Sequence, residues 1–203
     1  SAWHGAWAAI PTPFRDDLSL DLDALRRHVS FLCRHNIDGI VACGTTGEAA
    51  TLTQEEKRIV IETVLDAVAG AVPVIAGVGT NDTRTTIENA KMAQSAGAAG
   101  LLVVTPYYNK PNQEGLYRHF TSVANAVALP QIVYVVPGRT GCKCQPETIA
   151  RVALHENIVG VKDATGDMLF ATETHRLVSD EFLMFSGDDG TTMPFVALGG
   201  IGT

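Results

Sequence analysis

Two kinds of segment alternate along the chain. Apolar runs that end in Gly, Pro, Thr or Asn recur roughly every 25–35 residues, the span of one strand and one helix. They occupy residues 6–14, 39–47, 72–81, 100–109, 130–141, 158–166 and 182–190. Helical spacing of apolar residues is found over 22–35, 53–68, 84–96, 112–127, 146–155, 167–179 and 191–198. The sequence Thr-Gln-Glu-Glu at 53–56 has the pattern of a capping box.

Apolar strands that alternate with amphipathic helices predict an α/β fold with a parallel sheet covered by helices. Seven such units and a final stub, LGGIGT, fit an open doubly wound sheet or a (β/α)8 TIM barrel. The number of units favours the barrel, and no GxGxxG or Walker A motif follows the first strand. The barrel is therefore the predicted fold.

A complete barrel usually has about 250 residues, whereas this chain has 203 and stops where an eighth strand would begin. No linker, repeat or low-complexity segment divides it. We therefore expect residues 1–203 to form one C-terminally incomplete barrel domain, without the eighth strand and the helices that follow it. Such a domain would expose two sheet edges, so the active protein is expected to be longer.

The composition is that of a globular protein, 46% hydrophobic and 18% charged. With a net charge of −7 and no basic stripe, the chain would repel a phosphate backbone, so we expect no nucleic-acid partner. No apolar run approaches the roughly 20 residues of a membrane-spanning helix, and the N-terminus lacks a basic flank before a long apolar segment. These features predict a cytoplasmic protein with no membrane partner.

The cysteines and histidines do not suggest a metal site. Four cysteines are expected to be free thiols, because a chain of this length can bury a core without disulfides. The spacing of Cys142 and Cys144 does not match a CxxC motif, and the six histidines are isolated, with no HExxH motif. The sequence therefore predicts no bound metal.

The strand at 158–166 places a lysine among apolar residues. Two-residue alternation puts Lys162 on the same side as Ile158 and Gly160. If that side faces the barrel interior, burial would lower the pKa of Lys162 and provide the neutral amine that attacks a carbonyl. The alternative is a lysine that extends from the strand end into solvent.

The next candidates lie on the strand at 130–141. Tyr134 shares its side with Ile132 and Val136, and its hydroxyl suits a proton relay or a backbone partner in the core. Arg139, in the loop that follows, suits a bidentate contact with a carboxylate or an exposed position. In a parallel barrel the loops after the strands share one face, so these groups are expected to converge with Lys162.

Two further loops carry candidate groups. GTTGE at 44–48 offers hydroxyls and amides to a small anion, or is a tight turn capped by its own threonines. TPYYN at 105–109 contains paired tyrosines that suit interface packing, a proton relay or both. Neither segment decides the function by itself.

Taken together, the segments resemble a known family. GTTGE (44–48), TPYYNKPNQEGLYRHF (105–120), VYVVPGRTG (133–141), GVKDATG (160–166) and SGDDG (186–190) occur in the order seen in dihydrodipicolinate synthases. The chain resembles this family of pyruvate-dependent class I aldolases over essentially its whole length, which implies the (β/α)8 barrel. The GTTGE-like turn and the lysine are shared by several such aldolases, whereas TPYYN and the arginine of PGRTG are typical of the synthases.

The resemblance implies how pyruvate would be bound and activated. Lys162 would form a Schiff base with pyruvate, whose methyl group then loses a proton to give an enamine, so no cofactor is expected. Thr45 and Thr46 would hold the pyruvate carboxylate. Gly187 would line the pyruvate pocket, where a side chain would collide with the substrate.

The resemblance also implies the second half of the reaction. Tyr134, Thr46 and either Tyr107 or Tyr108 would transfer protons, with Tyr108 the stronger match. Arg139 would bind the carboxylate of L-aspartate 4-semialdehyde, which the enamine attacks to give 4-hydroxy-tetrahydrodipicolinate for lysine and diaminopimelate biosynthesis. In the family the relay tyrosine comes from a neighbouring subunit, which implies a homotetramer, a dimer of dimers.

The chain departs from the family at some positions. Val135 stands where asparagine is common, and we expect it to point away from Tyr134. Asn81 and Tyr107 match the allosteric pocket of members inhibited by lysine. Serine, histidine and glutamate, frequent in that pocket, are replaced here by Ala49, Gln54, Lys57 and Thr85. Because Lys57 would repel the ammonium of lysine, we expect weak or no inhibition.

Two other functions stay open. The chain could be another pyruvate-dependent aldolase, similar to N-acetylneuraminate lyase or hydroxy-oxoglutarate aldolase, although Arg139 and the pair Tyr107 and Tyr108 argue against this. It could also be a non-catalytic barrel relative that binds a ligand without turnover. The presence of Lys162, Tyr134 and Thr46 argues against that reading.

Overall fold

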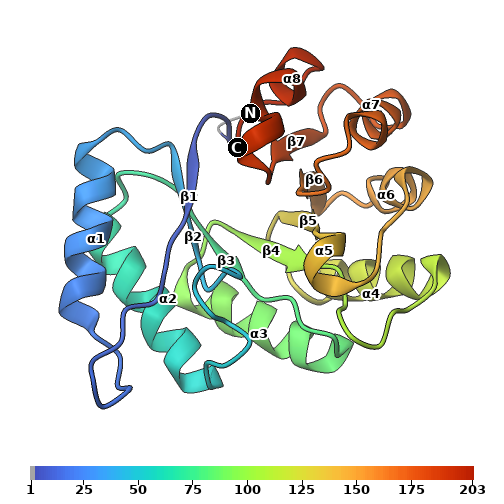
Figure 1. Cartoon of the computed structure of the whole chain (residues 1–203). Helices are drawn as coiled ribbons and strands as arrows, with labels where there is room; N and C mark the ends of the chain where they lie inside the picture. The colour runs from blue at the N-terminus through green and yellow to red at the C-terminus, as the bar shows by residue number, and fades with distance from the viewer. Residues whose placement is uncertain (1–2) are drawn as a thin grey trace.

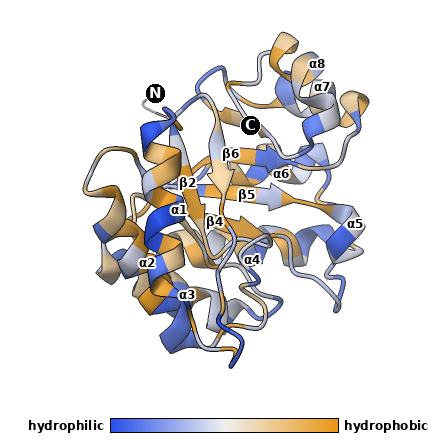
Figure 2. Cartoon of the chain, turned by 60° about the vertical axis from the view of Figure 1, so that its left-hand side comes forward, coloured by the Kyte–Doolittle hydropathy of each residue, from blue (hydrophilic) through white to orange (hydrophobic). Residues whose placement is uncertain are grey.

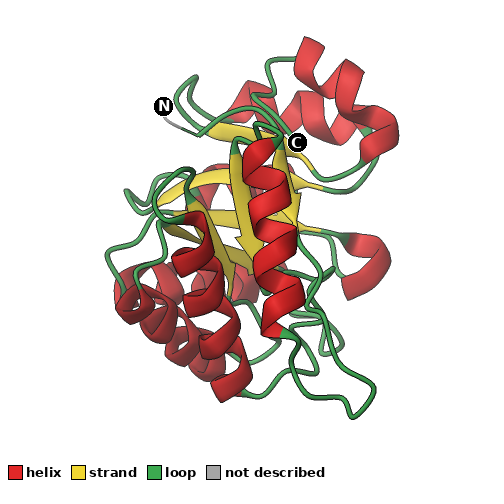
Figure 3. Ribbon diagram, turned by 90° about the vertical axis from the view of Figure 1, so that its left-hand side faces the viewer, coloured by secondary structure: helices red, strands yellow, loops and turns green. Residues whose placement is uncertain are grey.

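The computed structural model describes residues 3–203, which form one parallel sheet with helices packed around it (Figures 1 and 3). The strands are β1 (Trp7–Ala9), β2 (Gly39–Ala42), β3 (Val74–Gly77), β4 (Gly100–Val104), β5 (Gln131–Val135), β6 (Ile158–Asp163) and β7 (Leu183–Ser186). The helices are α1 (Leu22–Arg34), α2 (Gln54–Val68), α3 (Thr83–Ala96), α4 (Gln113–Ala126), α5 (Pro137–Thr140), α6 (Pro146–Val152), α7 (Met168–Leu177) and α8 (Thr192–Ala197), with a 3-10 turn, η1 (Asp189–Thr191), before α8.

The strands pair in sequence order, from β1 to β7, and every pairing is parallel. This arrangement confirms the predicted barrel architecture, and each predicted strand and helix is present. The strands are shorter than the apolar runs that predicted them, because the ends of those runs form the loops of one face. Two short elements were not expected: the residues after β5 form a single helical turn, α5, and those after β7 form the 3-10 turn η1.

The end of the described chain lies between the first and last strands. The described residues form no eighth strand, but Gly202 bridges to both Gly5 and Phe185. The amide of Trp7 donates to the Thr203 carbonyl at 2.8 Å, and the amide of Ser186 donates to the Gly202 carbonyl at 2.8 Å. Both β1 and β7 are therefore hydrogen bonded at their outer sides, in contrast to the two exposed edges expected from the sequence.

The sheet separates two apolar layers. The larger layer lies between the sheet and the helices, and the strands that contribute to it are mostly orange in Figure 2. The smaller layer fills the interior of the curved sheet and consists of Val41, Ile75, Leu102, Ile132, Tyr134, Val136, Leu183 and Phe185. Ile132, Tyr134 and Val136 share the inner face as predicted, and Val135 is fully buried on the helix side, pointing away from Tyr134.

An irregularity in β6 changes one prediction. The register with β5 shifts between Gln131 and Ile132, so that Gln131 pairs with Ile158 but Ile132 pairs with Gly160. Ile158 consequently belongs to the layer under the helices, whereas Val159 packs on the inner layer. The prediction that Ile158 and Lys162 share a side is therefore wrong, because an extra residue breaks the two-residue alternation.

The predicted capping box starts α2. The Glu56 amide donates to the Thr53 hydroxyl oxygen at 3.2 Å, and the Thr53 amide donates to the Glu56 carboxylate at 2.8 Å. Two amides of the first helical turn thus have partners that the helix itself cannot provide.

We expect the substitution Thr53→Ala to lower the free energy of unfolding by about 1 kcal/mol, because it removes the N-cap acceptor. Urea unfolding followed by circular dichroism would measure the change. Thr172→Ala is the matched control, since this exposed threonine lies within α7 and its hydroxyl bonds only to the Met168 carbonyl. Equal midpoints for Thr53→Ala and the unchanged chain would contradict the prediction.

Candidate active site

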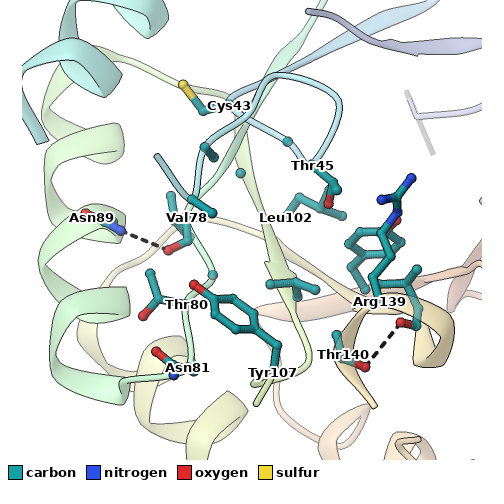
Figure 4. A pocket seen from close by; sticks show the side chains of 18 of the residues that line it. Cys43, Thr45, Val78, Thr80, Asn81, Asn89, Leu102, Tyr107, Arg139 and Thr140 are labelled. Atoms are coloured by element: carbon teal, nitrogen blue, oxygen red, sulfur yellow. Dashed lines mark hydrogen bonds between the residues drawn. The ribbon is translucent and has the colours of Figure 1, made fainter. Parts of the chain in front are cut away.

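A cavity of about 530 Å³ opens at the carboxyl ends of the strands. Its walls come from the loops after β2 and β3 on one side and from β5 and α5 on the other, with β4 between them. Figure 4 shows Cys43 and Asn89 at one end, Arg139 and Thr140 at the other, and Thr45 and Leu102 between the two ends. The predicted convergence of loops from separate strands is therefore present.

Lys162 lies on β6 directly beside Tyr134 of β5, with its Nζ 4.8 Å from the centre of the tyrosine ring. Its side chain is half-buried and also borders a small inner cavity with Trp7 and Phe185. Burial lowers the pKa of Lys162, and the negative charge of Asp189 opposes that decrease. The lysine is thus inside the barrel, with an increased share of the neutral amine that nucleophilic attack requires.

Tyr134 is buried at the floor of the cavity. Burial raises the pKa of its phenol, whereas a hydrogen bond with Thr45 and the positive charge of Arg139 oppose the increase. The phenol is consequently protonated at neutral pH and able to donate. These interactions bring Thr45, Arg139 and Lys162 around one tyrosine, as the sequence predicted.

The turn at 44–48 contributes amides as well as a hydroxyl. Cys43 and Glu48 adopt left-handed backbone conformations, with φ of 54° and 56°, and the Thr12 hydroxyl donates to the Gly47 carbonyl at 2.7 Å. The amides of Thr45 and Thr46 donate to no residue from 3 to 203, so both are available to an anion. Both threonines are exposed, but Thr45 lines the cavity whereas Thr46 is not part of its wall.

Arg139 is held by the helical turn α5. Its amide donates to the Val136 carbonyl at 3.0 Å, and Gly141 ends the turn with a φ of 66°. The guanidinium lines the cavity, is exposed and forms no ion pair within the described part of the chain. It can therefore bind an anionic ligand without first breaking an internal contact.

Gly187 packs directly on the lysine. A Cβ atom at this position would lie 2.9 Å from Cε of Lys162 and 2.9 Å from Cβ of Ala164. The Gly187 amide donates to the Asp163 carbonyl at 2.7 Å, which fixes the backbone there. A side chain added at Gly187 would thus collide with Lys162 itself. The sequence predicted a collision with the substrate only.

The paired tyrosines after β4 point to different places. Tyr107 lines the cavity together with Asn81, and its ring extends toward Thr80 in Figure 4. Tyr108 is 86% exposed, does not line this chain's own cavity and has a φ of 71°. Such a conformation is costly for an aromatic residue and is held here by the surrounding loop.

Some residues that shape the cavity were missed in the sequence. A Cβ on Gly77 would lie 2.1 Å from the Cys43 carbonyl oxygen, and one on Gly79 would lie 2.4 Å from the Val104 amide nitrogen. These glycines allow the loop after β3 to lie against its neighbours on both sides. Their spacing, GVG at 77–79, is the signal that could have identified them.

Among residues 3–203, no group of three or more His, Cys, Asp or Glu side chains could hold a metal ion. The four cysteines are free thiols, and burial raises the pKa of Cys43 to about 12. In the same part of the chain, no helix is long and apolar enough to cross a membrane.

A parallel barrel whose interior lysine lies beside a buried tyrosine fits a class I aldolase-type lyase. Comparison with known proteins specifies the family. Residues 2–203 match the model of the dihydrodipicolinate synthetase family, and the chain belongs to that family.

Individual relatives agree with this assignment. The 4-hydroxy-tetrahydrodipicolinate synthases of Pelobacter propionicus and Pseudomonas aeruginosa are each 50% identical to the chain, which covers 69% and 68% of their lengths. In both alignments 98% of this chain is matched. The crystal structure of dihydrodipicolinate synthase from Aquifex aeolicus superposes with a TM-score of 0.96 at 41% identity, over 98% of this chain and 68% of that one.

We expect Gly187→Ala to slow formation of a borohydride-trapped pyruvate adduct by about 100-fold, because the new methyl group displaces the amine from its attack position. Intact-mass spectrometry at timed intervals would measure the rate. Gly190→Ala is the control, since a Cβ there would be 3.6 Å from the nearest atom, in the Asp188 carboxylate. Similar rates for both variants would refute the assigned contact.

The pH dependence of the same reaction tests the environment of Lys162. The rate should rise as the amine loses its proton, with a midpoint below the ordinary pKa of 10.5. Asp189→Asn removes the charge that favours the ammonium, so the midpoint should move to still lower pH. Asp180→Asn, before β7 and at its opposite end, should leave the midpoint in place. A shift to higher pH in Asp189→Asn would be incompatible with this electrostatic arrangement.

Proposed function

We propose that the protein condenses pyruvate with L-aspartate 4-semialdehyde to give 4-hydroxy-tetrahydrodipicolinate, within lysine and diaminopimelate biosynthesis in the cytoplasm. The observation that carries this proposal is the position of Lys162, half-buried inside the barrel with its Nζ 4.8 Å from the centre of the ring of Tyr134, which itself lines the cavity. The names of the relatives, which are 4-hydroxy-tetrahydrodipicolinate synthases, support the choice of reaction.

The first step is formation of the Schiff base. The neutral amine of Lys162 attacks the ketone carbon of pyruvate, a C–N bond forms, and the ketone oxygen leaves as water after it receives two protons. Tyr134 would pass these protons, and its protonated phenol and hydrogen bond with Thr45 support this role. The free amides of Thr45 and Thr46 would bind the pyruvate carboxylate.

The second step is carbon–carbon bond formation. The iminium withdraws electrons, so the methyl group of pyruvate loses a proton and the resulting enamine attacks the aldehyde carbon. Arg139, which has no internal ion-pair partner among residues 3–203, would hold the carboxylate of the semialdehyde. The amino group of the semialdehyde then attacks the iminium carbon, which closes the ring, and the bond from that carbon to Nζ breaks to release Lys162. Neither step requires a cofactor.

A homo-oligomer, a dimer of dimers, completes this proposal. Tyr108 is exposed and turned away from the cavity of its own chain, so a proton relay through it requires a second copy of the chain. A contact between Tyr108 and a second copy of the chain would also explain why this residue keeps a costly left-handed backbone conformation.

Trapping with pyruvate and borohydride tests the mechanism. Peptide mass spectrometry should locate a reduced adduct on Lys162, and the adduct should be lost in Lys162→Met but kept in Lys91→Met, a change at an exposed lysine of α3. Absence of the adduct from the folded, full-length protein would instead favour a binding protein.

A panel of acceptor aldehydes then tests the second substrate. With pyruvate present, L-aspartate 4-semialdehyde should be consumed faster than N-acetylmannosamine or glyoxylate, because N-acetylmannosamine has no carboxylate for Arg139 and glyoxylate carries its carboxylate directly on the aldehyde carbon. Faster consumption of another aldehyde would be compatible with the Schiff-base mechanism but would show that L-aspartate 4-semialdehyde is not the preferred acceptor.

A further inference from the structure

Trp7 borders the same small inner cavity as Lys162. The cavity has a volume of about 20 Å³, and its walls are apolar side chains of the inner layer together with Trp7, Lys162 and Thr203. Such a space is about large enough for one water molecule, but a buried water molecule typically makes about three hydrogen bonds. Because the walls are mostly apolar, the space favours exclusion of water from this side of the lysine.

The indole of Trp7 is linked to the lysine through Phe185. Phe185 of β7 pairs with Lys162 in the sheet, and its ring lies edge-on to the Trp7 ring, with 5.9 Å between the ring centres. Trp7 also lies edge-on to Trp3, with ring centres 5.4 Å apart. Three aromatic rings thus follow one another, and the last belongs to the strand next to Lys162.

Two glycines leave space for the indoles at the amino ends of the strands. A Cβ atom on Gly39, the first residue of β2, would lie 2.3 Å from Cδ2 of Trp7. A Cβ atom on Gly100, the first residue of β4, would lie 2.2 Å from Cη2 of Trp3. Because both glycines begin their strands, the indoles cover the end of the barrel opposite the large cavity.

Trp7 is fixed in this place by hydrogen bonds. Its Nε1 donates to the His4 carbonyl at 3.1 Å, and its backbone amide donates to the Thr203 carbonyl at 2.8 Å. The polar atom of the indole therefore has a partner, and the hydrocarbon part of the ring is left to form an apolar wall. Trp7 is half-buried, so it separates the inner cavity from the outside of the barrel. The reaction steps above do not use it.

We propose that Trp7 is a positioning residue for Lys162: together with Phe185, its indole closes the amino end of the barrel interior and keeps water from the amine on that side. The inference rests on the proposed function in one respect, that Lys162 is the nucleophile. Two other groups act on the amine: Tyr134 of β5, whose phenol is protonated, and Asp189 of η1, whose negative charge favours the ammonium. Trp7 and Phe185 carry no charge, so they act by excluding water.

Competitive acetylation with acetic anhydride over a range of pH, followed by peptide mass spectrometry, tests this role. It measures the pH midpoint at which the Lys162 amine of the full-length protein becomes reactive. Trp7→Leu should raise that midpoint by about one pH unit, toward the ordinary pKa of 10.5, because water that enters beside the amine stabilises the ammonium. Trp7→Phe, which keeps a ring, should retain most of the original value.

Trp3→Leu is the matched control for the acetylation experiment. Trp3 belongs to the same group of rings but does not border the inner cavity, so its loss should leave the midpoint of Lys162 in place. Gly39→Ala is a second route, in case Trp7→Leu does not fold, because the new methyl group would displace the indole and should also raise the midpoint. An unchanged midpoint in Trp7→Leu, or in Gly39→Ala where Trp7→Leu does not fold, would overturn the proposal. An equal increase in Trp3→Leu would do the same.

Timed trapping of the pyruvate adduct with borohydride connects this role to the reaction. At a pH below the midpoint, a rise of about one unit leaves about tenfold less neutral amine, so Trp7→Leu should form the adduct about tenfold more slowly. Trp3→Leu should keep the rate, and equal rates in both variants would contradict the proposal. Acetylation requires no pyruvate, so it decides the role of Trp7 even if the unchanged protein forms no adduct, a result that would count against the proposed function instead.

Discussion

The register between β5 and β6 is the constraint on which the site depends. Tyr134 pairs with Lys162 only because one extra residue in β6 shifts the pairing after Gln131. Without that shift, the alternation that places Ile158 under the helices would place Lys162 there as well, since the two residues are four positions apart. The bulge therefore turns the lysine into the barrel, where burial lowers its pKa and Gly187 leaves room for its side chain.

Most of the fold could be predicted from hydrophobic patterning. Each of the seven apolar runs contains a strand, and the capping box at Thr53 starts its helix as expected. The bulge in β6 could not be predicted, because Ile158, Val159 and Val161 are all apolar and fit either face. The hydrogen bonds of Gly202 to both edge strands were also missed, since a run rich in glycine carries no strand pattern.

The sequence predicted those residues of the candidate site that lie at the carboxyl ends of strands. Lys162, Tyr134, Thr45 and Arg139 converge because consecutive parallel strands bring their carboxyl ends to one face. The exposure of Tyr108 was harder to predict from the sequence, because it follows from loop geometry and a left-handed φ rather than from residue type. The buried state of Lys57 was missed for a similar reason: on a helix, lysine usually marks the solvent face.

The arrangement of charge in the cavity follows from these placements. Lys162 is surrounded by apolar side chains of the inner layer, which disfavour its charged form and make it a nucleophile. Arg139 and Lys57 instead lie where polar groups and the open cavity surround them, and neither has an internal counter-ion among residues 3–203. The small inner cavity thus contains a lysine suited to covalent attack, and the larger cavity contains two cations without internal counter-ions among residues 3–203. The strand order separates these two cations, because β4 lies between the cavity walls that carry them.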